Sequence, residues 1–297
     1  TQWYGPGRKR HYGTVIEAGR KGMPGAGKRL ARLAVDPLYP VIVRATALSL
    51  LNAYPSETFT RACNLALMDD EALIRRTALD SLNASGMDRK VKLVSPLLYD
   101  PVKAVRIQAA FMLAGEPSKH LDANEKKVFQ SALKEFISAM EYSGDFAFGR
   151  YNLGNLYVAL NKTEEAIRQY EAAIKIDDLF YPAKVNLAML YNGMGRDEAA
   201  ERLLRETVAE HPQLYEAAYS LGLLLVERKK HQDAVEYLRK AAKGMPDHAR
   251  VHYNLGLLLQ QLKQIEEAET ALNRALEIAP DTMDYLHAMA DHYLRRG

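Results

Sequence analysis

The sequence predicts an all-α protein built as an α-α superhelix, a solenoid in which each helix pair packs on its neighbours. Three observations carry this prediction. Residue types recur at a constant interval between positions 147 and 280, and a second pattern recurs at a slightly shorter interval between positions 26 and 115. Both patterns have the spacing of helix faces. The chain is 48% hydrophobic, which is ample for a packed core.

Residues 1–22 are expected to form an irregular basic arm, with Trp3 and the basic run at residues 8–10. The letters G-M-P-G-A-G-K at residues 22–28 have the spacing of a phosphate-binding loop. However, Arg29 stands where that motif needs Ser or Thr to hold magnesium, and no buried strand precedes it. We interpret this segment as a turn that connects two helices.

Residues 23–118 are expected to form paired, HEAT-like helices. Arg44, Arg75 and Arg106 recur in register, each followed by an alanine and then a leucine. Aspartates precede these helices at positions 36, 69 and 100 and are expected to cap them. Each helix follows another amphipathic stretch. Paired helices with a recurring arginine resemble HEAT repeats, which also stack as an α-solenoid. We expect the arginines to bond aspartates and carbonyl groups between repeats rather than a ligand.

Residues 119–146 are expected to contain a linker and a capping half repeat. Ala132, Phe136 and Ala139 lie on the stretch Asn124 to Glu141, at the offsets that a second helix of the C-terminal repeat would have. The segment therefore predicts one helix that begins the array without a preceding partner.

Residues 147–297 are expected to form the array itself, with units at 147–180, 181–214, 215–248 and 249–282 and a partial unit at 283–297. Two sets of residues recur in these units, and we call each set a ladder. The first helix of each unit has a small residue, namely Gly154, Ala188, Gly222 or Gly256. The second helix has an alanine followed four positions later by a large residue, namely Ala166 with Tyr170, Ala200 with Leu204, Ala234 with Leu238 or Ala268 with Leu272. A small side chain lets one helix approach another closely, while the large one fills the space beside it. The ladders predict two packed helices per unit, separated by short breaks at 161–162, 193–195 and 228–230.

These ladders resemble the tetratricopeptide repeat (TPR), a helix-turn-helix unit of about 34 residues that stacks into a right-handed superhelix. Asp178 stands where other units have proline, and Thr207 where they have alanine. We expect both to alter local stability rather than the fold. The partial unit repeats only a first helix, whose apolar face would be uncovered. That indicates a truncated protein, an oligomer contact through this C-terminal helix, or a helix that serves alone as a cap.

No residue pattern in the sequence indicates catalysis, a cofactor or a metal, so we expect a protein that is not an enzyme. His248 and His252 have the spacing of metal ligands, but no acidic or cysteine partner is in phase with them. We interpret them as surface or capping residues. The single cysteine, Cys63, excludes an internal disulfide. It lies on an apolar helix face, where a buried, unreactive thiol is expected.

The first helices of TPR arrays line a concave groove, which supplies our candidate partner-binding residues. They are Tyr151, Asn152, Asn155, Val185, Asn186, Met189, Tyr219, Ser220, Leu223, Tyr253, Asn254 and Leu257. A line of amides at positions 152, 186 and 254 could hold the backbone of an extended peptide, as the asparagine ladder of some TPR proteins does. The alternative is that these amides bond neighbouring groups. The tyrosines add flat amphipathic contact area.

The charge is uneven along the chain. The formal net charge is +3, but residues 1–118 carry 17 Lys/Arg against 10 Asp/Glu, while residues 119–297 carry 23 against 27. No apolar run approaches the roughly 18 residues that would suggest a membrane span. The chain starts at Thr1 without a leader, which favours a processed protein or an excised fragment.

The order of arm, glycine-rich turn, HEAT-like pairs and TPR units resembles the C-terminal region of bacterial multi-haem c-type cytochromes. This resemblance implies an assembly module of a periplasmic electron-transfer protein; without it, the cytoplasm is the expected compartment. The chain has no Cys-x-x-Cys-His motif and so cannot itself attach haem covalently.

The function expected first is a non-enzymatic scaffold that holds a protein or peptide partner in the groove. The first alternative is the cytochrome assembly module. A second alternative is nucleic-acid binding through the basic arm, which is disfavoured because the arm offers few aromatic residues for stacking, namely Trp3, Tyr4 and Tyr12.

Overall fold

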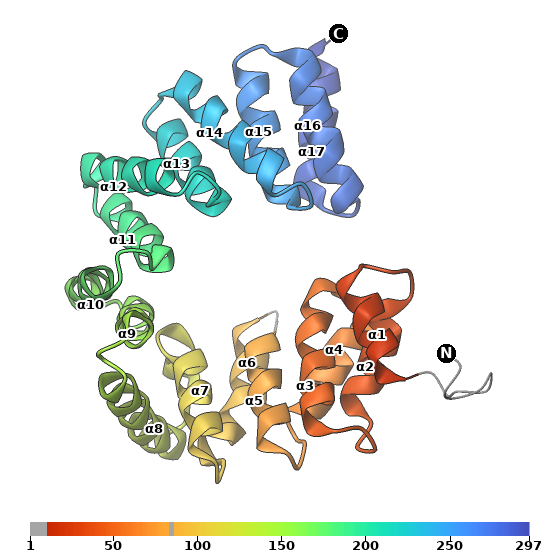
Figure 1. Ribbon diagram of the computed structural model, residues 1–297, viewed down its shortest axis with the longest axis vertical. Coiled ribbons are helices and arrows are strands. Elements are labelled where there is room, and N and C mark those ends of the chain that lie inside the picture. The colour runs from red at the N-terminus through yellow and green to blue at the C-terminus, as the bar shows by residue number, and fades with distance from the viewer. Residues whose placement is uncertain (1–10, 83–85, 297) are drawn as a thin grey trace, which may run out of the picture. The chain divides into compact units, whose positions relative to one another are not determined.

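A computed structural model describes residues 11–82 and 86–296 of the chain. Its helices are α1 (Tyr12–Arg20), α2 (Ala26–Val35), α3 (Val41–Leu50), α4 (Glu57–Ala66), α5 (Ala72–Ser81), α6 (Met87–Val94), α7 (Lys103–Leu113), α8 (Ala123–Tyr142), α9 (Ala147–Ala159), α10 (Thr163–Ile176), α11 (Tyr181–Gly193), α12 (Asp197–Glu210), α13 (Tyr215–Glu227), α14 (His231–Gly244), α15 (Ala249–Gln261), α16 (Ile265–Ile278) and α17 (Met283–Arg296). Leu51–Ala53, Ser95–Tyr99 and Glu116–His120 are 3-10 helices. The described residues contain no strand, which confirms the all-α prediction (Figure 1).

The chain divides into two compact units. Unit 1 comprises Thr1–Ser143 with Asn155–Lys162, and unit 2 comprises Gly144–Gly154 with Thr163–Gly297. The division therefore passes through α9. The finer segments expected from the sequence, with boundaries after residues 22, 118 and 146, remain predictions.

Unit 1 is built from paired helices in two layers. Helices α3, α5 and α7 pack in succession, and α2 and α4 pack on them from the other layer (Figure 1). The recurring alanines Ala47, Ala78 and Ala109 are fully buried, so neighbouring helices approach closely there. Large side chains such as Leu48 and Ile74 fill the space between the layers. The register of the recurring alanines therefore marks a packed face, while the HEAT-like resemblance remains a prediction.

Helix α1 corrects the expectation of an irregular arm over residues 1–22. Residues 1–10, which hold the tryptophan and the basic run, lie outside the described part of the chain, but the residues after them form α1. Val15 packs against the core of unit 1, and the backbone at Gly19 lies against Leu30 of α2. The apolar residues of α1 have helical spacing and pack against α2 and the core of unit 1. This tertiary contact stabilises α1, which is too short to be a stable helix in isolation.

Residues 22–28, which have the spacing of a phosphate-binding loop, contain a turn between α1 and α2, as interpreted from the sequence. Gly22 and Gly25 have positive φ angles of 66° and 71°, which glycine adopts without steric cost. Helix α2 begins at Ala26, and Arg29 donates from Nη2 to the carbonyl of Pro24 at 3.3 Å. The segment therefore reverses the chain direction and folds back on itself.

The recurring arginines connect successive helix pairs of unit 1, which confirms their expected structural role. Arg75 donates to the carboxylate of Asp100 from Nε and Nη2, at 2.6 and 2.9 Å. In the same way Arg44 bonds the carboxylate of Asp69. Arg106 reaches a glutamate of α8 at 2.8 Å. Each arginine also donates to backbone carbonyl groups, so the ladder fixes the turns between the helices.

The aspartates of this ladder are not the helix caps that the sequence suggested. The N-cap residues of α3, α5 and α7 are Pro40, Glu71 and Val102. Asp36, Asp69 and Asp100 instead accept from the backbone N–H two residues on, at 3.0, 3.0 and 2.8 Å. These are Asx-turns. Two of the three carboxylates also serve the arginine of the preceding pair, and a position ahead of the helix allows both bonds.

Helix α8 matches the predicted capping half repeat in extent. Asp122 and Glu125 form a capping box at its start, in which each side chain bonds the backbone of the other. Ala132 and Phe136 are buried in the core of unit 1. The Phe136 ring stacks on Phe111 of α7 with centroids 5.3 Å apart. The apolar face of α8 is therefore packed on α7.

Unit 2 stacks two helices per repeat, as the ladders predicted. Helix α11 packs with α12, α13 with α14 and α15 with α16, and α17 packs on α16. A Cβ added to Gly222 would lie 2.8 Å from Leu238, and one on Gly256 would lie 2.7 Å from Leu272. Neither contact is sterically acceptable, so glycine at these two positions leaves the space that the leucines of the second helix fill.

The turn inside each repeat uses one left-handed residue at a fixed position. Asn161, Gly195, Lys229 and Lys263 have φ angles of 56°, 71°, 59° and 59°. They fall at the three predicted breaks and at the equivalent position of the last full unit. The same turn geometry therefore joins the two helices of every full repeat, although glycine occupies the left-handed position in only one of them.

The two departures from the repeat pattern have local partners. Asp178 lies 2.8 Å from the ammonium group of Lys184, which is 4% exposed and also bonds Glu210 at 3.0 Å. Burial opposes the charge on Lys184, but the two carboxylates outweigh it and raise the pKa of the ammonium group. Thr207 is fully buried and donates to the carbonyl of Leu203 at 2.7 Å.

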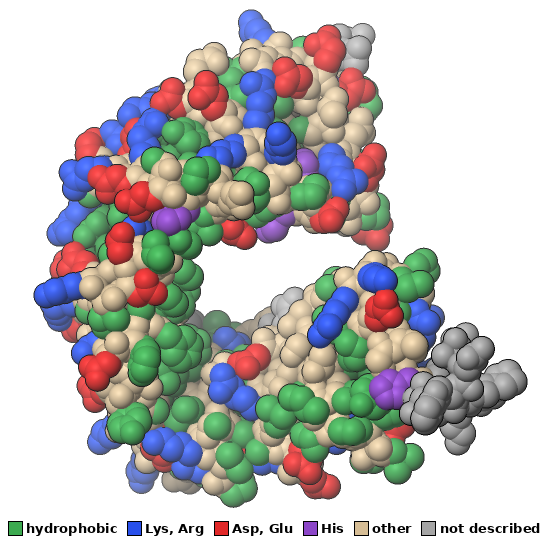
Figure 2. Space-filling model, viewed as in Figure 1, with side chains coloured by type: hydrophobic (Ala, Val, Ile, Leu, Met, Phe, Trp, Pro, Cys, Tyr) green, Lys and Arg blue, Asp and Glu red, His purple; other side chains and the backbone are tan. Residues whose placement is uncertain are grey.

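No described helix is both long and apolar enough to cross a membrane. On the face in view, Figure 2 shows acidic and basic side chains interspersed over helices α11–α16.

Candidate functional site

Side-chain hydrogen bonds join consecutive first helices of unit 2 along one face. The Nδ2 of Asn254 on α15 donates to the hydroxyl of Tyr219 on α13 at 2.6 Å. The Nδ2 of Asn192 on α11 donates to Glu227 of α13 at 2.8 Å. Residues one helical turn from these contacts share the same surface. We call this surface the first-helix face and define it by Tyr151, Val185, Asn186, Met189, Tyr219, Leu223, Tyr253, Asn254 and Leu257.

Tyrosines and asparagines on this face are coupled between neighbouring repeats. Tyr219 is followed 35 residues later by Asn254, which bonds its hydroxyl. Tyr151 is followed at the same interval by Asn186, whose Nδ2 lies 3.4 Å from the Tyr151 hydroxyl. Where the earlier residue is valine, the later one is Ser220, which donates to a carbonyl of its own helix at 3.0 Å. In these two cases asparagine therefore occurs 35 residues after a tyrosine whose hydroxyl group it can bond.

This coupling bears on the two interpretations of the amide line. Asn186 and Asn254 bond neighbouring tyrosines, as the alternative interpretation described. Asn152 is half-buried on α9, and Asn155 belongs to the part of α9 that clusters with unit 1. The structure thus brings the candidate residues of α11, α13 and α15 together, whereas Asn155 is not among them. Contact of these amides with a partner remains a prediction.

The hydroxyl group of Tyr219 remains protonated at neutral pH. Burial raises the pKa of Tyr219, against the opposing effect of the bond from Asn254. Burial also raises the pKa of Tyr170, beside Tyr151, to about 12. A phenol that accepts a bond from an amide keeps its own proton for a second bond. Tyr219 can therefore donate to a carbonyl oxygen of a bound molecule.

Apolar side chains lie one helical turn beyond Val185, Tyr219 and Tyr253. Met189 is 62% exposed and Leu257 is 37% exposed, with half-buried Leu223 on the helix between them. Tyr253 packs against Tyr285 of α17 with ring centroids 4.8 Å apart, and the guanidinium of Arg250 lies 5.2 Å from its ring. The face therefore combines positioned aromatic rings with exposed aliphatic groups.

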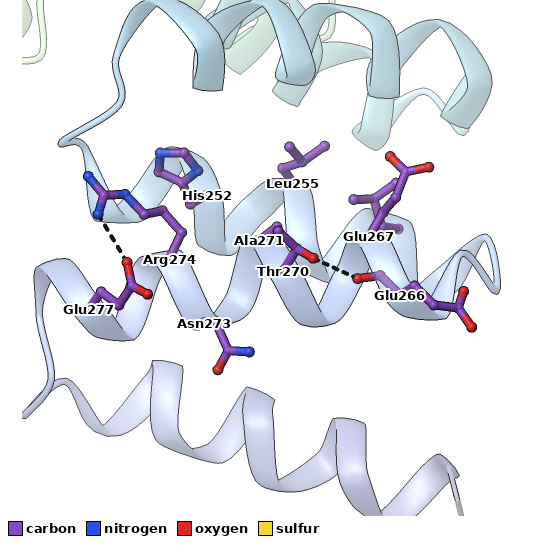
Figure 3. A pocket seen from close by; sticks show the side chains of 10 residues that line it. His252, Leu255, Glu266, Glu267, Thr270, Ala271, Asn273, Arg274 and Glu277 are labelled. Atoms are coloured by element: carbon purple, nitrogen blue, oxygen red, sulfur yellow. Dashed lines mark hydrogen bonds and ion pairs between the residues drawn. The ribbon is translucent and has the colours of Figure 1, made fainter.

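A hollow of about 640 Å³ lies elsewhere on unit 2, against α15 and α16 (Figure 3). His252 and Arg274 reach it from these helices, and both bond the carbonyl of Pro246 at 3.1 Å. Arg274 also pairs with Glu277 at 3.0 Å. Burial lowers the pKa of His252, which favours its neutral form. These groups hold the turn before α15, which agrees with the structural interpretation of His252.

The ionisable groups seen elsewhere do not form a reactive cluster. Cys63 is 2% exposed, and burial raises the pKa of its thiol to about 12, as expected for an unreactive cysteine. Within residues 11–82 and 86–296, no group of three or more His, Cys, Asp or Glu side chains is placed to hold a metal ion.

Exposed apolar residues at the turns of unit 1 were not predicted from the sequence. Leu38 is 90% exposed, Met68 is 77% exposed and Tyr99 is 55% exposed. Met68 and Tyr99 directly precede an Asx-turn aspartate, and Leu38 follows one at two residues. The sequence does show an apolar residue near each recurring aspartate. From the sequence alone, however, such a residue cannot be distinguished from the buried apolar residues of the adjacent helix.

Comparison with known proteins agrees with the repeat ladders. The tetratricopeptide repeat family model matches residues 157–222 and 225–291. No curated protein matches the chain. A solved structure of MamA residues 41 to the end from Desulfovibrio magneticus RS-1 is 20% identical and covers 50% of this chain and 85% of its own, with a TM-score of 0.46. YrrB, described as a TPR protein with an unusual peptide-binding site, is 22% identical and covers 68% of this chain and 98% of its own, with a TM-score of 0.44.

The family match and the packing of unit 2 lead to the same assignment. The matched residues include the paired helices α11 to α16 and their small and large ladders. The resemblance of the N-terminal helices to HEAT repeats and the resemblance of the whole chain to cytochromes remain predictions. Residues 157–222 and 225–291 therefore consist of tetratricopeptide repeats, by the family model that matches them and by their helix packing.

Proposed function

We propose that the chain is a non-enzymatic scaffold that binds a protein or peptide partner on the first-helix face of unit 2. The observation that carries this proposal is the row of exposed Met189, half-buried Leu223 and exposed Leu257 beside a tyrosine, Tyr219, whose hydroxyl is bonded by asparagine. Exposed apolar residues that repeat along one face are typical of interaction surfaces. Tyrosine also contributes strongly to binding energy at interfaces.

The bonds between repeats favour binding because they position the face in advance. A side chain that is already ordered loses less conformational entropy when a partner binds. Tyr219, fixed by Asn254, offers a hydroxyl donor beside the aliphatic row. The matching partner is a segment with apolar side chains and an accessible main-chain carbonyl group.

We propose to test this face with a phage-displayed library of short random peptides, selected on the full chain. Peptides rich in apolar residues should bind the wild-type protein, and the double variant Met189→Glu with Leu257→Glu should bind them at least about tenfold more weakly, because charge would be buried on contact. Asn254→Ala should also weaken binding by releasing the Tyr219 ring. Affinity of each selected peptide is measured by fluorescence anisotropy.

The matched control is Leu179→Glu, which places the same charge on an apolar residue that is 61% exposed in unit 2 but outside the face. It should bind the peptides like wild type. Circular dichroism should show equal helicity in all variants. Equal affinity of the double variant and the control would refute the proposal.

The two alternatives remain predictions. The cytochrome assembly role rests on the order of arm, turn and repeats along the chain and on loosely similar sequence at residues 11–22 and 42–51. For nucleic-acid binding, the basic run lies outside the described residues, while Lys21 of the same region pairs with Glu17 at 2.7 Å. The face of unit 2 therefore supports partner binding better than either alternative.

A further inference from the structure

Helix α17 is a first helix by its packing. Tyr285, Ala288, Met289 and His292 are 6%, 8%, 7% and 2% exposed and lie against the preceding repeat. The hydroxyl of Tyr293 donates to Glu269 of α16 at 3.0 Å. The helix therefore docks on the array through the side that joins one repeat to the next.

The adjacent side of α17 is apolar and exposed. Leu286 is 43% exposed, Tyr293 is 49% exposed and Leu294 is 82% exposed, and Ala290 between them is exposed as well. Ala290 follows Gly256 at the interval of one repeat, so it occupies the small position of the last, partial unit. The small residue of the first helix is buried in the full repeats, whereas its counterpart on α17, Ala290, is exposed.

The preceding repeats show what covers these positions. Gly222 and Gly256 are buried under Leu238 and Leu272 of the second helices α14 and α16. Tyr293 corresponds to Leu259, which is 1% exposed beneath α16. The same kind of helix therefore covers the same side of each preceding first helix, and this interface continues onto α17.

We propose that the exposed side of α17 binds an amphipathic helix of the second-helix type, which carries an alanine and, four residues later, a leucine. Repeat 181–214 provides the template because its small residue, Ala188, is alanine like Ala290. Its second helix covers that residue with Leu204, and the two side chains are 0% and 2% exposed. A leucine facing Ala290, with apolar neighbours over Leu286 and Tyr293, reproduces this packing.

The α12 segment itself is the matching probe. A fluorescein-labelled peptide of residues 196–211, with blocked ends, is titrated against the full chain and followed by anisotropy. We expect saturable binding with an increase in helicity, because a helix of this length is marginal in water until it is packed. A peptide with Leu204→Glu should not bind.

Variants of α17 locate the site. Ala290→Arg should weaken binding of the peptide by about tenfold or more, because the arginine would occupy the place of the leucine and bring a charge into the contact. The control is Leu179→Glu, an exposed position of unit 2 that is not on α17, which should bind the peptide like wild type. The groove variant Met189→Glu with Leu257→Glu should also bind the peptide, which separates this site from the proposed groove.

Three results would overturn the proposal. The first is the absence of saturable binding by a chain whose circular dichroism shows full helicity. The second is binding that Ala290→Arg leaves unchanged. The third is a dimer, seen by sedimentation velocity and abolished by Ala290→Arg, in a protein that does not bind the peptide. That outcome would make a second copy of the chain the occupant of the face.

Discussion

At the scale of single residues, Asp100 is more deeply buried than Asp69, the other aspartate that pairs with an arginine of the ladder. Its carboxylate is 3% exposed, accepts two bonds from Arg75 and accepts a third from the backbone N–H of Val102. Burial opposes the negative charge, but these bonds outweigh it and lower the pKa of Asp100. One residue therefore supports both an Asx-turn and the link between two helix pairs.

Replacing Asp100 should destabilise unit 1 strongly. Asp100→Ala would leave the guanidinium of Arg75, which is 12% exposed, without its carboxylate partner. We expect a loss of about 3 kcal/mol in the free energy of unfolding. The control is Arg76→Ala, which removes a pair 3.4 Å long with more exposed side chains. That variant should lose about 0.5 kcal/mol. Urea unfolding measures both, and equal losses would contradict the prediction.

At the scale of elements, the turns decide where helices end and how closely they approach. Gly195, Lys229 and Lys263 share one left-handed backbone position, and a Cβ added to Gly195 would meet no other atom within 4 Å. Gly115 differs. Its φ and ψ are 79° and −133°, and an added Cβ would overlap the carbonyl of Ala159 within unit 1. Only glycine meets both requirements at this position.

The two glycines therefore predict different costs for the same substitution. Gly115→Ala should lower the free energy of unfolding by about 3 kcal/mol or more, because backbone strain and a clash with main-chain atoms add. Gly195→Ala should cost about 1 kcal/mol, since only the left-handed conformation opposes it. Thermal or urea unfolding of the two variants tests the difference. Similar stabilities would show that the contact with Ala159 relaxes easily.

At the scale of the whole molecule, the repeats of unit 2 touch their sequence neighbours. Helix α14 packs with α13 and α15, and Leu238 is fully buried at this contact. In such arrays stability is close to a sum of repeat and nearest-neighbour terms. Damage to one repeat should therefore remain close to it in sequence.

Leu238→Ala is expected to loosen the middle of unit 2 alone. The buried cavity should cost about 2–5 kcal/mol. Amide hydrogen exchange should then accelerate in α13, α14 and α15, while protection in α2 to α5 of unit 1 stays unchanged. The matched variant Leu48→Ala, also fully buried, should give the opposite distribution. Uniform loss of protection in either variant would show one cooperative unit instead.

Several features followed from the sequence because periodicity reports which side of each helix is buried. The all-α fold, the paired helices, the positions of the turns and the extent of α8 could all be predicted in this way. So could the bonds of Arg44 and Arg75 to aspartates, because a buried charge at a fixed offset requires a partner. The candidate face was also located by phase alone, although its use by a partner remains a prediction.

Other features depend on contacts between residues far apart in the chain. Helix α1 forms because α2 covers it, and the aspartates lie ahead of the helices because they must also meet an arginine from the previous pair. The bond between Asn254 and Tyr219 has the same origin. Periodicity determined which residues form the helices and which sides are apolar. Only the tertiary structure decided which polar groups bond each other, because each of those groups had several partners of equal chemistry within the pattern.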